Sequence, residues 1–330
     1  MNIFITGASG FIGSAVARRL LEEGHTLRAL TRHPERLMKR VQAEGVEVIV
    51  GDIVDPDIVD QAAAGCEVTY AIAGTFREPN LSDARYRAVN TAASEHIIRS
   101  AAKHGHKRVI HCSTCGIHGT AAPGQRIAED DPFDGIGIYE ETKAQGEVRA
   151  RELGEELDID VTVIRPTQVY GPGDTRLLKL FKMADKDRPL ILGSGKGGYH
   201  LVYIDDLVDA FLLAGTLDQA VGEAYLIGGG EVPSLNEMFA ELGKVFGREN
   251  PKPRRPPVLP FMWAGIVCET LCRPLGISPP IYRRRVEFFT NNRSFDISKA
   301  REQLGYDPKV TMADGLRRTA QWYRDEGMLE

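Results

Sequence analysis

TGASGFIG, residues 6–13, is the stretch that decides the fold, since it joins an apolar run at 2–6 to an amphipathic run at 11–23. Glycine between a strand and a helix is typical of dinucleotide sites, because it permits a tight turn, close approach to a pyrophosphate and close helix–strand packing. The helix N-terminus then presents N–H groups and partial positive charge to phosphates. We therefore expect dinucleotide contacts from Gly7, Ser9, Gly10, Phe11, Ile12 and Gly13.

Strand-like and helix-like segments alternate with short connections through the first half of the chain. This alternation predicts a parallel sheet with helices on both faces, which is an α/β fold of the Rossmann-type, doubly wound class. The predicted strands are 2–6, 25–31, 46–50, 67–72, 108–112 and 161–165. The predicted helices are 11–23, 34–43, 56–64, 82–104 and 138–157.

The second half of the chain is less regular. Proline and glycine become dense after Gly171, residues 251–260 predict a linker or an ordered irregular loop, and residues 312–326 predict a helix. We predict that residues 1–170 are mainly an NAD(P)-binding Rossmann domain. Residues 171–330 are then mainly a smaller C-terminal substrate-binding region, part of which returns to the first domain.

Composition narrows the class of protein. The chain of 330 residues carries a formal net charge of -5, so it has no basic field to attract nucleic acid. Its five cysteines are scattered and odd in number, which argues against a secreted disulfide framework. Neither Cys112/Cys115 nor Cys268/Cys272 has a histidine in zinc-finger spacing, so we predict free thiols and no metal site.

No segment predicts a membrane span. The most apolar later stretch, residues 258–277, is interrupted by Glu269, Arg273 and Pro274 and falls short of the roughly 20 apolar residues that a span needs. The chain begins on a strand-like run, so we expect no signal peptide. These features predict a cytoplasmic enzyme with no integral membrane segment.

The end of the second strand indicates the cofactor. An acidic residue there holds a ribose 2′-hydroxyl, whereas an arginine can hold a 2′-phosphate. This chain has Arg32 and no carboxylate before Glu35, so we predict NADP in preference to NAD; the alternative is that Arg32 is a solvated loop residue. Asp52, followed by Ile53 after the third strand, is predicted to accept a hydrogen bond from the adenine amino group.

Tyr139 and Lys143 lie four residues apart on a predicted helix and therefore share one face. A lysine beside a phenol favours the phenolate and lowers the tyrosine pKa from its usual value of about 10. Such a tyrosine can donate or accept the proton of a substrate carbonyl or alcohol. Ser113 or Thr114, at the end of the strand 108–112, could hydrogen-bond the same oxygen.

Together these segments resemble the extended short-chain dehydrogenase/reductase family, in its NAD-dependent epimerase/dehydratase group, over nearly the whole chain. Residues 6–13 are similar to the glycine motif of the family, and Tyr139 and Lys143 match its catalytic pair. The register of residues 113–119 implies that Thr114 is the catalytic hydroxyl. The resemblance also implies that Tyr139 and Lys143 contact the cofactor, in a site that includes Ile72, Ala73, Gly74, Asn90, Pro166 and Val169.

The C-terminal part resembles the 3β-hydroxysteroid dehydrogenase-like branch, through residues 279–280, 293–300 and 304–308. That branch often acts on apolar alcohols or ketones, which implies a small, apolar substrate. Residues 258–277 would then form an apolar wall over the site, or else pack in the core or a dimer interface.

Two departures from the family bear on the substrate. Nucleotide-sugar enzymes of the family usually carry asparagine where this chain has Gln168, and arginine where it has His200. Both residues normally help to hold the diphosphate of the substrate. Their absence favours a substrate other than a nucleotide sugar.

The predicted function is an NAD(P)-dependent oxidoreductase that transfers a hydride between nicotinamide and a carbonyl or secondary alcohol, with Tyr139 as the acid/base. The first alternative is a nucleotide-sugar epimerase or dehydratase with tightly bound NAD. The second is a catalytically silent sensor, against which an intact Thr114, Tyr139 and Lys143 argue. The resemblance further implies a homodimer, formed by the helices predicted at 82–104 and 138–157.

Overall fold

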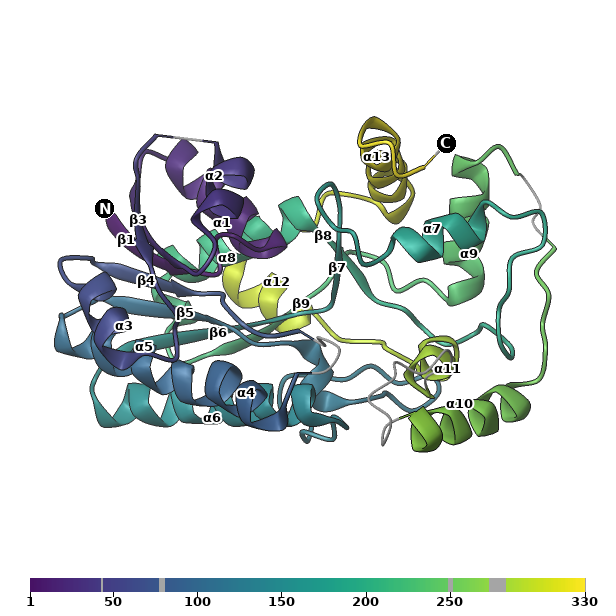
Figure 1. Ribbon diagram of the computed structural model, residues 1–330, viewed down its shortest axis with the longest axis horizontal. Helices are drawn as coiled ribbons and strands as arrows, with labels where there is room; N and C mark the ends of the chain where they lie inside the picture. Colours follow the sequence, from purple (N-terminus) through teal and green to yellow (C-terminus); the bar gives the residue numbers. More distant parts are fainter. Residues whose placement is uncertain (43, 77–80, 249–251, 273–282, 330) are drawn as a thin grey trace.

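Seven parallel strands form the central sheet, in the order β3-β2-β1-β4-β5-β6-β9 (Figure 1). The computed structural model describes residues 1–330 except 43, 77–80, 249–251, 273–282 and 330. The strands are β1 (Asn2–Thr6), β2 (Thr26–Thr31), β3 (Val46–Val50), β4 (Val68–Ala71), β5 (Arg108–Cys112), β6 (Asp160–Pro166) and β9 (Ala224–Ile227). A separate pair, β7 (Gln168–Tyr170) and β8 (Leu201–Tyr203), is also parallel.

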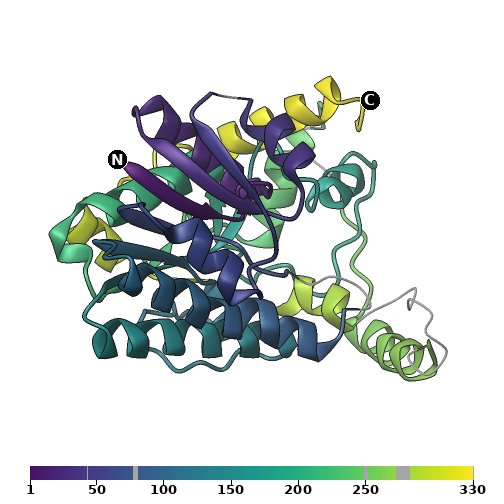
Figure 2. The ribbon, with the colours of Figure 1, turned by 60° about the vertical axis from the view of Figure 1, so that its left-hand side comes forward.

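Helices cover both faces of the sheet (Figures 1 and 2). One face carries α1 (Phe11–Glu22), α2 (Pro34–Val41) and α8 (Ile204–Thr216). The other carries α3 (Pro56–Ala63), α4 (Asp83–Arg87), α5 (Ala93–Lys103) and α6 (Ile138–Glu156). None of the helices within the described ranges is both long and apolar enough to span a bilayer.

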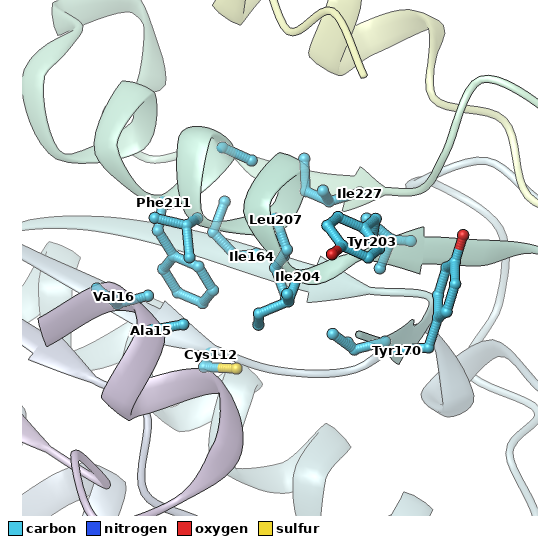
Figure 3. Packing of buried hydrophobic residues seen from close by; sticks show 14 of the residues in the cluster. Ala15, Val16, Cys112, Ile164, Tyr170, Tyr203, Ile204, Leu207, Phe211 and Ile227 are labelled. Carbon is cyan, nitrogen blue, oxygen red and sulfur yellow. The ribbon is translucent and has the colours of Figure 1, made fainter. Parts of the chain in front are cut away.

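Alternate residues of each strand enter two cores, as a sheet buried on both faces requires. In β1, Ile3 and Ile5 pack on the side of α1 and α8, and Phe4 packs on the opposite side. Figure 3 shows the first core, where Val16 of α1 and Phe211 of α8 meet over the sheet. This two-sided burial explains why the strands read as continuous apolar runs in the sequence.

The remaining elements lie beyond the carboxyl ends of the strands (Figure 1). Two groups stand apart, with α7 (Leu178–Ala184), α9 (Leu235–Val245) and α13 (Met312–Asp325) on one side and α10 (Val258–Cys272) with α11 (Arg283–Thr290) on the other. The helix α12 (Ser298–Leu304) returns to the sheet and contacts β9. The strand order reverses between β1 and β4, and ligands of doubly wound sheets bind at such a reversal.

The predicted α/β class and doubly wound parallel sheet are confirmed, with most element bounds within one or two residues of the prediction. One predicted helix is wrong in detail: residues 82–104 form α4, a π-helical turn at Ala88–Ala92 and α5. The π turn continues the helix without a break, and residues 82–104 contain no glycine or proline that would mark it in the sequence. Beyond Gly171 the alternation continues through β8, α8 and β9, which the glycine-rich sequence had obscured.

Residues 252–257 form an ordered irregular segment, one of the two structures predicted for 251–260. The backbone N–H of Ile191 donates to Arg254, and that of Arg254 donates to Pro189. The segment ends where α10 begins, at Val258, inside the predicted loop. Pro251 lies outside the described residues.

The glycine turn between β1 and α1 packs backbone against backbone. Gly7 has φ +79, and a Cβ there would lie 2.7 Å from the backbone nitrogen of Ala73. A Cβ on Gly13 would lie 2.2 Å from the carbonyl oxygen of Gly7. Both distances are shorter than real contacts allow, so only glycine permits this turn.

We expect Gly13→Ala to lower the free energy of unfolding by about 2–3 kcal/mol, because the new methyl group meets rigid backbone. Alanine would otherwise stabilise a helical position by up to about 1 kcal/mol, so helix propensity acts in the opposite direction. Urea denaturation measures the change. The control is Gly230→Ala, whose added Cβ would meet nothing closer than 3.6 Å. Equal stability of the two variants would contradict the packing argument.

Candidate active site

A cleft of about 680 Å³ opens at the carboxyl ends of β1, β4 and β5. It runs from the end of β2, past the glycine turn, to the segment that follows α11. Of the residues predicted as a cofactor or catalytic site, the cleft is lined by Gly7, Ser9, Gly10, Phe11, Ile12, Gly13, Arg32, Asp52, Ile53, Ile72, Ala73, Gly74, Thr114, Tyr139, Lys143, Pro166 and Val169. Asn90 alone of that set does not line it.

The glycine turn forms the floor of the cleft and fits a diphosphate. The backbone N–H of Gly10 donates to the carbonyl of Gly7 at 2.8 Å, which closes the turn and begins α1. No side chain caps this end of α1. The N-terminus of a 12-residue helix therefore faces the cleft beside Gly7, Gly10 and Gly13, which carry no Cβ, so that an anion can approach the backbone closely.

The end of the cleft at β2 and β3 is cationic and organised around one carboxylate. Arg85 of α4 donates to Asp52, and the guanidinium of Arg32 lies 3.8 Å from the same carboxylate. Burial alone would raise the pKa of Asp52, but the hydrogen bonds from Arg85 and from the N–H of Val54 hold that pKa below its ordinary value. No sequence motif marks Arg85, because 33 residues separate it from Asp52.

Ser9 and Thr31 tie the glycine turn to the end of β2. The Thr31 hydroxyl donates to Ser9 Oγ at 3.2 Å and accepts from the backbone N–H of His33 at 3.0 Å. Ser9, Arg32 and His33 all line the cleft. This corner therefore combines hydroxyl groups with a guanidinium, a suitable donor set for a phosphate.

Tyr139, Lys143 and Thr114 all line the same cleft. Lys143 Nζ donates to the carbonyl of Cys112, at the end of β5, at 2.5 Å. Burial lowers the pKa of the Lys143 ammonium from its ordinary value. The ring of Phe76 meets the Tyr139 ring edge-on, with centroids 5.0 Å apart, and so forms a wall beside the phenol.

Thr114 is placed by the short 3-10 turn at Cys115–His118, which it caps. Its Oγ1 accepts a hydrogen bond from the N–H of Gly116 at 3.1 Å. Because the oxygen is an acceptor in this bond, the hydroxyl hydrogen is available for a second acceptor in the cleft. Ser113 also lines the cleft, and its Oγ has no hydrogen-bond partner among the described residues.

Asn90 lies in the π-helical turn and supports the site from behind. Its side-chain oxygen accepts from the N–H of Thr75 at 2.9 Å, and its amide donates to Thr142 on α6 at 3.1 Å. A Cβ on Gly74 would lie 3.4 Å from that oxygen and 4.0 Å from Lys143 Nζ. Asn90 therefore joins the loop after β4 to the helix that carries Tyr139 and Lys143.

A buried ion pair fixes α6 against β6. Arg165 and Glu147 are 2% and 1% exposed, and Arg165 Nη2 lies 2.5 Å from Glu147 Oε1. Arg165 Nη1 also donates to the carbonyl of Glu129 at 2.7 Å and lies 3.1 Å from His118 Nε2. Four segments of the chain therefore meet at the Arg165 guanidinium. Its partner Glu147 lies one turn of α6 beyond Lys143.

The far end of the cleft is lined by residues that sequence motifs did not indicate. These are Phe76, Arg176, Glu287, Asn291, Arg293 and Phe295. Arg176 donates to the buried carboxylate of Asp174 at 2.6 Å and to the carbonyl of Val169 at 3.1 Å. They come from three separate stretches of the chain, at 76, 176 and 287–295, so no local pattern could have identified them.

His200 lines the same end of the cleft, but its ring is bonded to the backbone of the protein. Its Nε2 lies 2.9 Å from the carbonyl oxygen of Gly229, and its ring stacks on Phe295 with centroids 6.4 Å apart. Burial lowers the pKa of His200, which favours the neutral ring. A neutral imidazole supplies no positive charge to a substrate diphosphate.

Residues 258–272 form neither the predicted wall over the cleft nor a core element. No residue of 258–272 lines the cleft, and only Gly265 of α10 is buried. The helix packs against α11 at the edge of the molecule instead (Figure 2). Residues 273–277 and the predicted branch motif at 279–280 lie outside the described residues.

None of the five cysteines forms a disulfide bond in the structure; Cys66 and Cys112 are buried, and the other three are partly buried. Within the described ranges, no three histidine, cysteine, aspartate or glutamate side chains are grouped so that they could hold a metal ion.

Two relatives match almost the whole chain. One is the 2-alkyl-3-oxoalkanoate reductase of Stenotrophomonas maltophilia, 30% identical over 96% of this chain and 98% of that protein. Another is the UDP-glucose 4-epimerase of Mycolicibacterium smegmatis, 28% identical over 99% of both chains. Among solved structures, that of gox2253 superposes with a TM-score of 0.82, at 27% identity and 99% coverage of both chains.

The family model for the NAD dependent epimerase/dehydratase family matches residues 3–228, which include the glycine turn, the seven strands and all three central cleft side chains. The match spans more than half of the chain. This chain therefore belongs to the NAD dependent epimerase/dehydratase family and is an NAD(P)-dependent enzyme of the extended short-chain dehydrogenase/reductase type.

Proposed function

We propose that the chain is an NADP-dependent reductase, or the reverse dehydrogenase, for a ketone or secondary alcohol with a substantial apolar part. The observation that carries this proposal is that Thr114, Tyr139 and Lys143 all line one cleft, beside a glycine turn fit for a diphosphate. Bound NADP(H) supplies or accepts the hydride. The side chains of the chain position the carbonyl and move its proton.

Tyr139 is the proposed acid and base. In the reducing direction its phenol donates a proton to the oxygen of the substrate carbonyl, and in the oxidising direction its phenolate accepts the proton of the alcohol. Thr114 donates a hydrogen bond to the same oxygen, since its own oxygen already accepts from Gly116. Phe76 limits the positions that the phenol and the substrate can take.

Lys143 is proposed to hold the nicotinamide ribose and to favour the phenolate form of Tyr139. Its ammonium uses one N–H on the carbonyl of Cys112 and has two more to donate. A cation one helical turn from the phenol lowers the free-energy cost of removing the phenol proton. Asn90 and Glu147 hold α6 in place, so that both side chains keep their position when the proton moves.

NADP is the proposed cofactor because the β2 end of the cleft is cationic. Arg32 is half exposed and borders the cleft with Ser9 and His33. Asp52 would repel a 2′-phosphate, but Arg85 already hydrogen-bonds this carboxylate. Neutralising Asp52 leaves the charge of Arg32 available to the phosphate.

The residues at the far end of the cleft favour a carbonyl substrate that is not a nucleotide sugar. His200 is neutral and bonded to backbone, and Arg176 is already paired with Asp174. The reductase of Stenotrophomonas maltophilia acts, by its name, on 2-alkyl-3-oxoalkanoates, which combine a ketone with alkyl chains. A ketone of this kind fits the aromatic part of the lining, Phe76 and Phe295.

A nucleotide-sugar epimerase is the second candidate. Arg293 borders the far end of the cleft and is the arginine there that could face a diphosphate. The mycobacterial epimerase is 28% identical over the full length. In that reaction the hydride returns to the opposite face of the same carbon, so the cofactor undergoes no net change.

A cytoplasmic homodimer is the proposed form of the enzyme. In the structure α5 and α6 pack side by side, and Val148 of α6 and Leu157, directly after it, are exposed side chains that a second copy could cover. Cysteines that form no disulfide bond fit a reducing compartment.

Replacing Tyr139 with phenylalanine removes the phenol oxygen but keeps the ring. We expect Tyr139→Phe to abolish turnover while the Kd for NADPH stays within about tenfold of the parent, or ~1.4 kcal/mol. Steady-state kinetics and NADPH fluorescence titration measure the two quantities. The control is Tyr225→Phe, since Tyr225 lies in β9 outside the cleft. Turnover retained by Tyr139→Phe would overturn the acid/base assignment.

Arg32→Ala tests the cofactor preference. We expect the Kd for NADPH to rise about tenfold or more and the Kd for NADH to change little, since a charge-assisted hydrogen bond contributes about 1.5–3 kcal/mol. Lys39→Ala on α2 is the control, because it removes an equal charge from an exposed position outside the cleft. Equal losses for both cofactors would show that Arg32 holds no 2′-phosphate.

Net oxidation of NADPH distinguishes the two candidate reactions. We expect the absorbance of reduced nicotinamide to fall when the purified chain and NADPH are mixed with a 2-alkyl-3-oxoalkanoate. With UDP-glucose and NAD we expect no UDP-galactose by chromatography. Interconversion of the two sugars, with no oxidation of NADPH by the ketone, would favour the epimerase.

A further inference from the structure

The helix α10 carries large apolar side chains on a face that the rest of the described protein leaves uncovered. Leu259, Trp263, Val267 and Leu271 are 71%, 65%, 51% and 64% exposed. They recur at every fourth residue, which places them along one side of the helix. We call these four residues the apolar stripe.

The position of α10 explains this exposure. The helix lies at the edge of the molecule and packs against α11 (Figures 1 and 2). Gly265, on the side opposite the stripe, is its only buried residue. Contiguous exposed apolar side chains of this size mark an interaction site, since each would otherwise lower the solubility of the chain.

Charge is distributed unevenly around the stripe. Residues 252–290 contain seven arginines or lysines and two glutamates, a net charge of +5 in a chain of net charge -5. Lys252, Arg254 and Arg255 precede the helix and are exposed, and Arg283 at the start of α11 is exposed beside Glu269. The segment with the apolar stripe is therefore also the basic segment of an otherwise acidic protein.

We propose that the apolar stripe docks on the surface of an anionic phospholipid bilayer. Helices with an apolar face and basic flanks lie in the plane of the interface, where the apolar side chains enter the acyl boundary and cations meet the headgroups. Fifteen residues give a helix of about 22 Å, shorter than the roughly 30 Å hydrocarbon core, so α10 lies on the bilayer and does not cross it. Trp263, at the middle of the stripe, suits the headgroup boundary, where tryptophan is enriched.

A second copy of the chain fits the stripe less well. A symmetric contact between two stripes would bring together two segments of net charge +5, and these repel each other. A bilayer rich in anionic lipid has the opposite charge and presents an apolar layer beneath it. Charge complementarity therefore selects the bilayer.

Docking would place the cleft beside the bilayer. α11 packs on α10, and Glu287 of α11 and the adjoining Asn291 line the cleft. A substrate with alkyl chains, as proposed above, would then have a short path from the bilayer. The docking itself rests on α10 and its flanks and is tested without any substrate.

The two tryptophans of the chain allow a direct test. Trp322 lies half-buried on α13, so Trp322→Phe leaves Trp263 as the sole indole reporter. We expect Trp263 fluorescence to shift to shorter wavelength with phosphatidylglycerol vesicles, and to be quenched by brominated phosphatidylglycerol. Phosphatidylcholine vesicles should bind at least about tenfold more weakly, and salt should weaken binding to phosphatidylglycerol.

Variants of the stripe provide the second measurement. In co-sedimentation with phosphatidylglycerol vesicles, we expect Leu259→Ser/Val267→Ser to bind at least about tenfold more weakly than the parent. Val50→Ser is the control, because Val50 is 63% exposed on β3, far from α10, and its loss should change binding less than twofold. Circular dichroism and NADPH binding check that each variant folds.

Three outcomes would overturn the proposal. The first is no spectral shift and no co-sedimentation at millimolar phosphatidylglycerol. The second is equal binding to both lipids, which would remove the role of the basic segment. The third is a shift without vesicles that grows with protein concentration, together with a larger sedimentation coefficient, which would assign the stripe to a second copy. Each result is independent of turnover, so it does not depend on the proposed reaction.

Discussion

The contact between the backbone of Gly7 and that of Gly13 is the constraint on which the rest of the structure depends. A Cβ on either residue would enter another backbone, that of Ala73 or of Gly7 itself. The absence of both Cβ atoms lets the turn after β1 press against α1 and the end of β4 at once. This contact leaves the N-terminus of α1 open over the point where the strand order reverses. The turn thereby joins the topology of the sheet to the chemistry of the cleft.

A second set of contacts holds the reacting side chains to that frame. Tyr139 and Lys143 belong to α6, which lies across the sheet from α1. Asn90 binds α6 to the loop after β4, and Arg165 binds Glu147 of α6 to the strand β6. The buried charges cost desolvation energy, which their mutual hydrogen bonds offset. In return the phenol and the ammonium occupy defined positions beside a cleft that must admit both a cofactor and a substrate.

The C-terminal half adds elements of two kinds. Elements such as β9, α8 and α12 extend the sheet and its cores, whereas α10 and α11 stand at the edge of the cleft. The exposed side chains of α10 do not stabilise the described fold, since they contact little of it. Exposed apolar side chains and positive charge occur together in this one segment of an acidic chain. The segment connects the cleft to an external surface of the protein.

The sequence by itself determined the α/β class, the glycine turn and the set of candidate site residues, because these depend on local periodicity and on residue types at short spacing. Tyr139 and Lys143 are visible in this way, as they are one helical turn apart. Only the tertiary structure decided that Arg85 meets Asp52, that His200 is bonded to backbone, and that Arg293 and Phe295 complete the cleft. It also decided that α10, apolar enough to be read as a wall or a core helix, lies exposed at the periphery. These contacts join residues distant in the chain, and burial depends on which faces the folded elements present to one another, which no local pattern specifies.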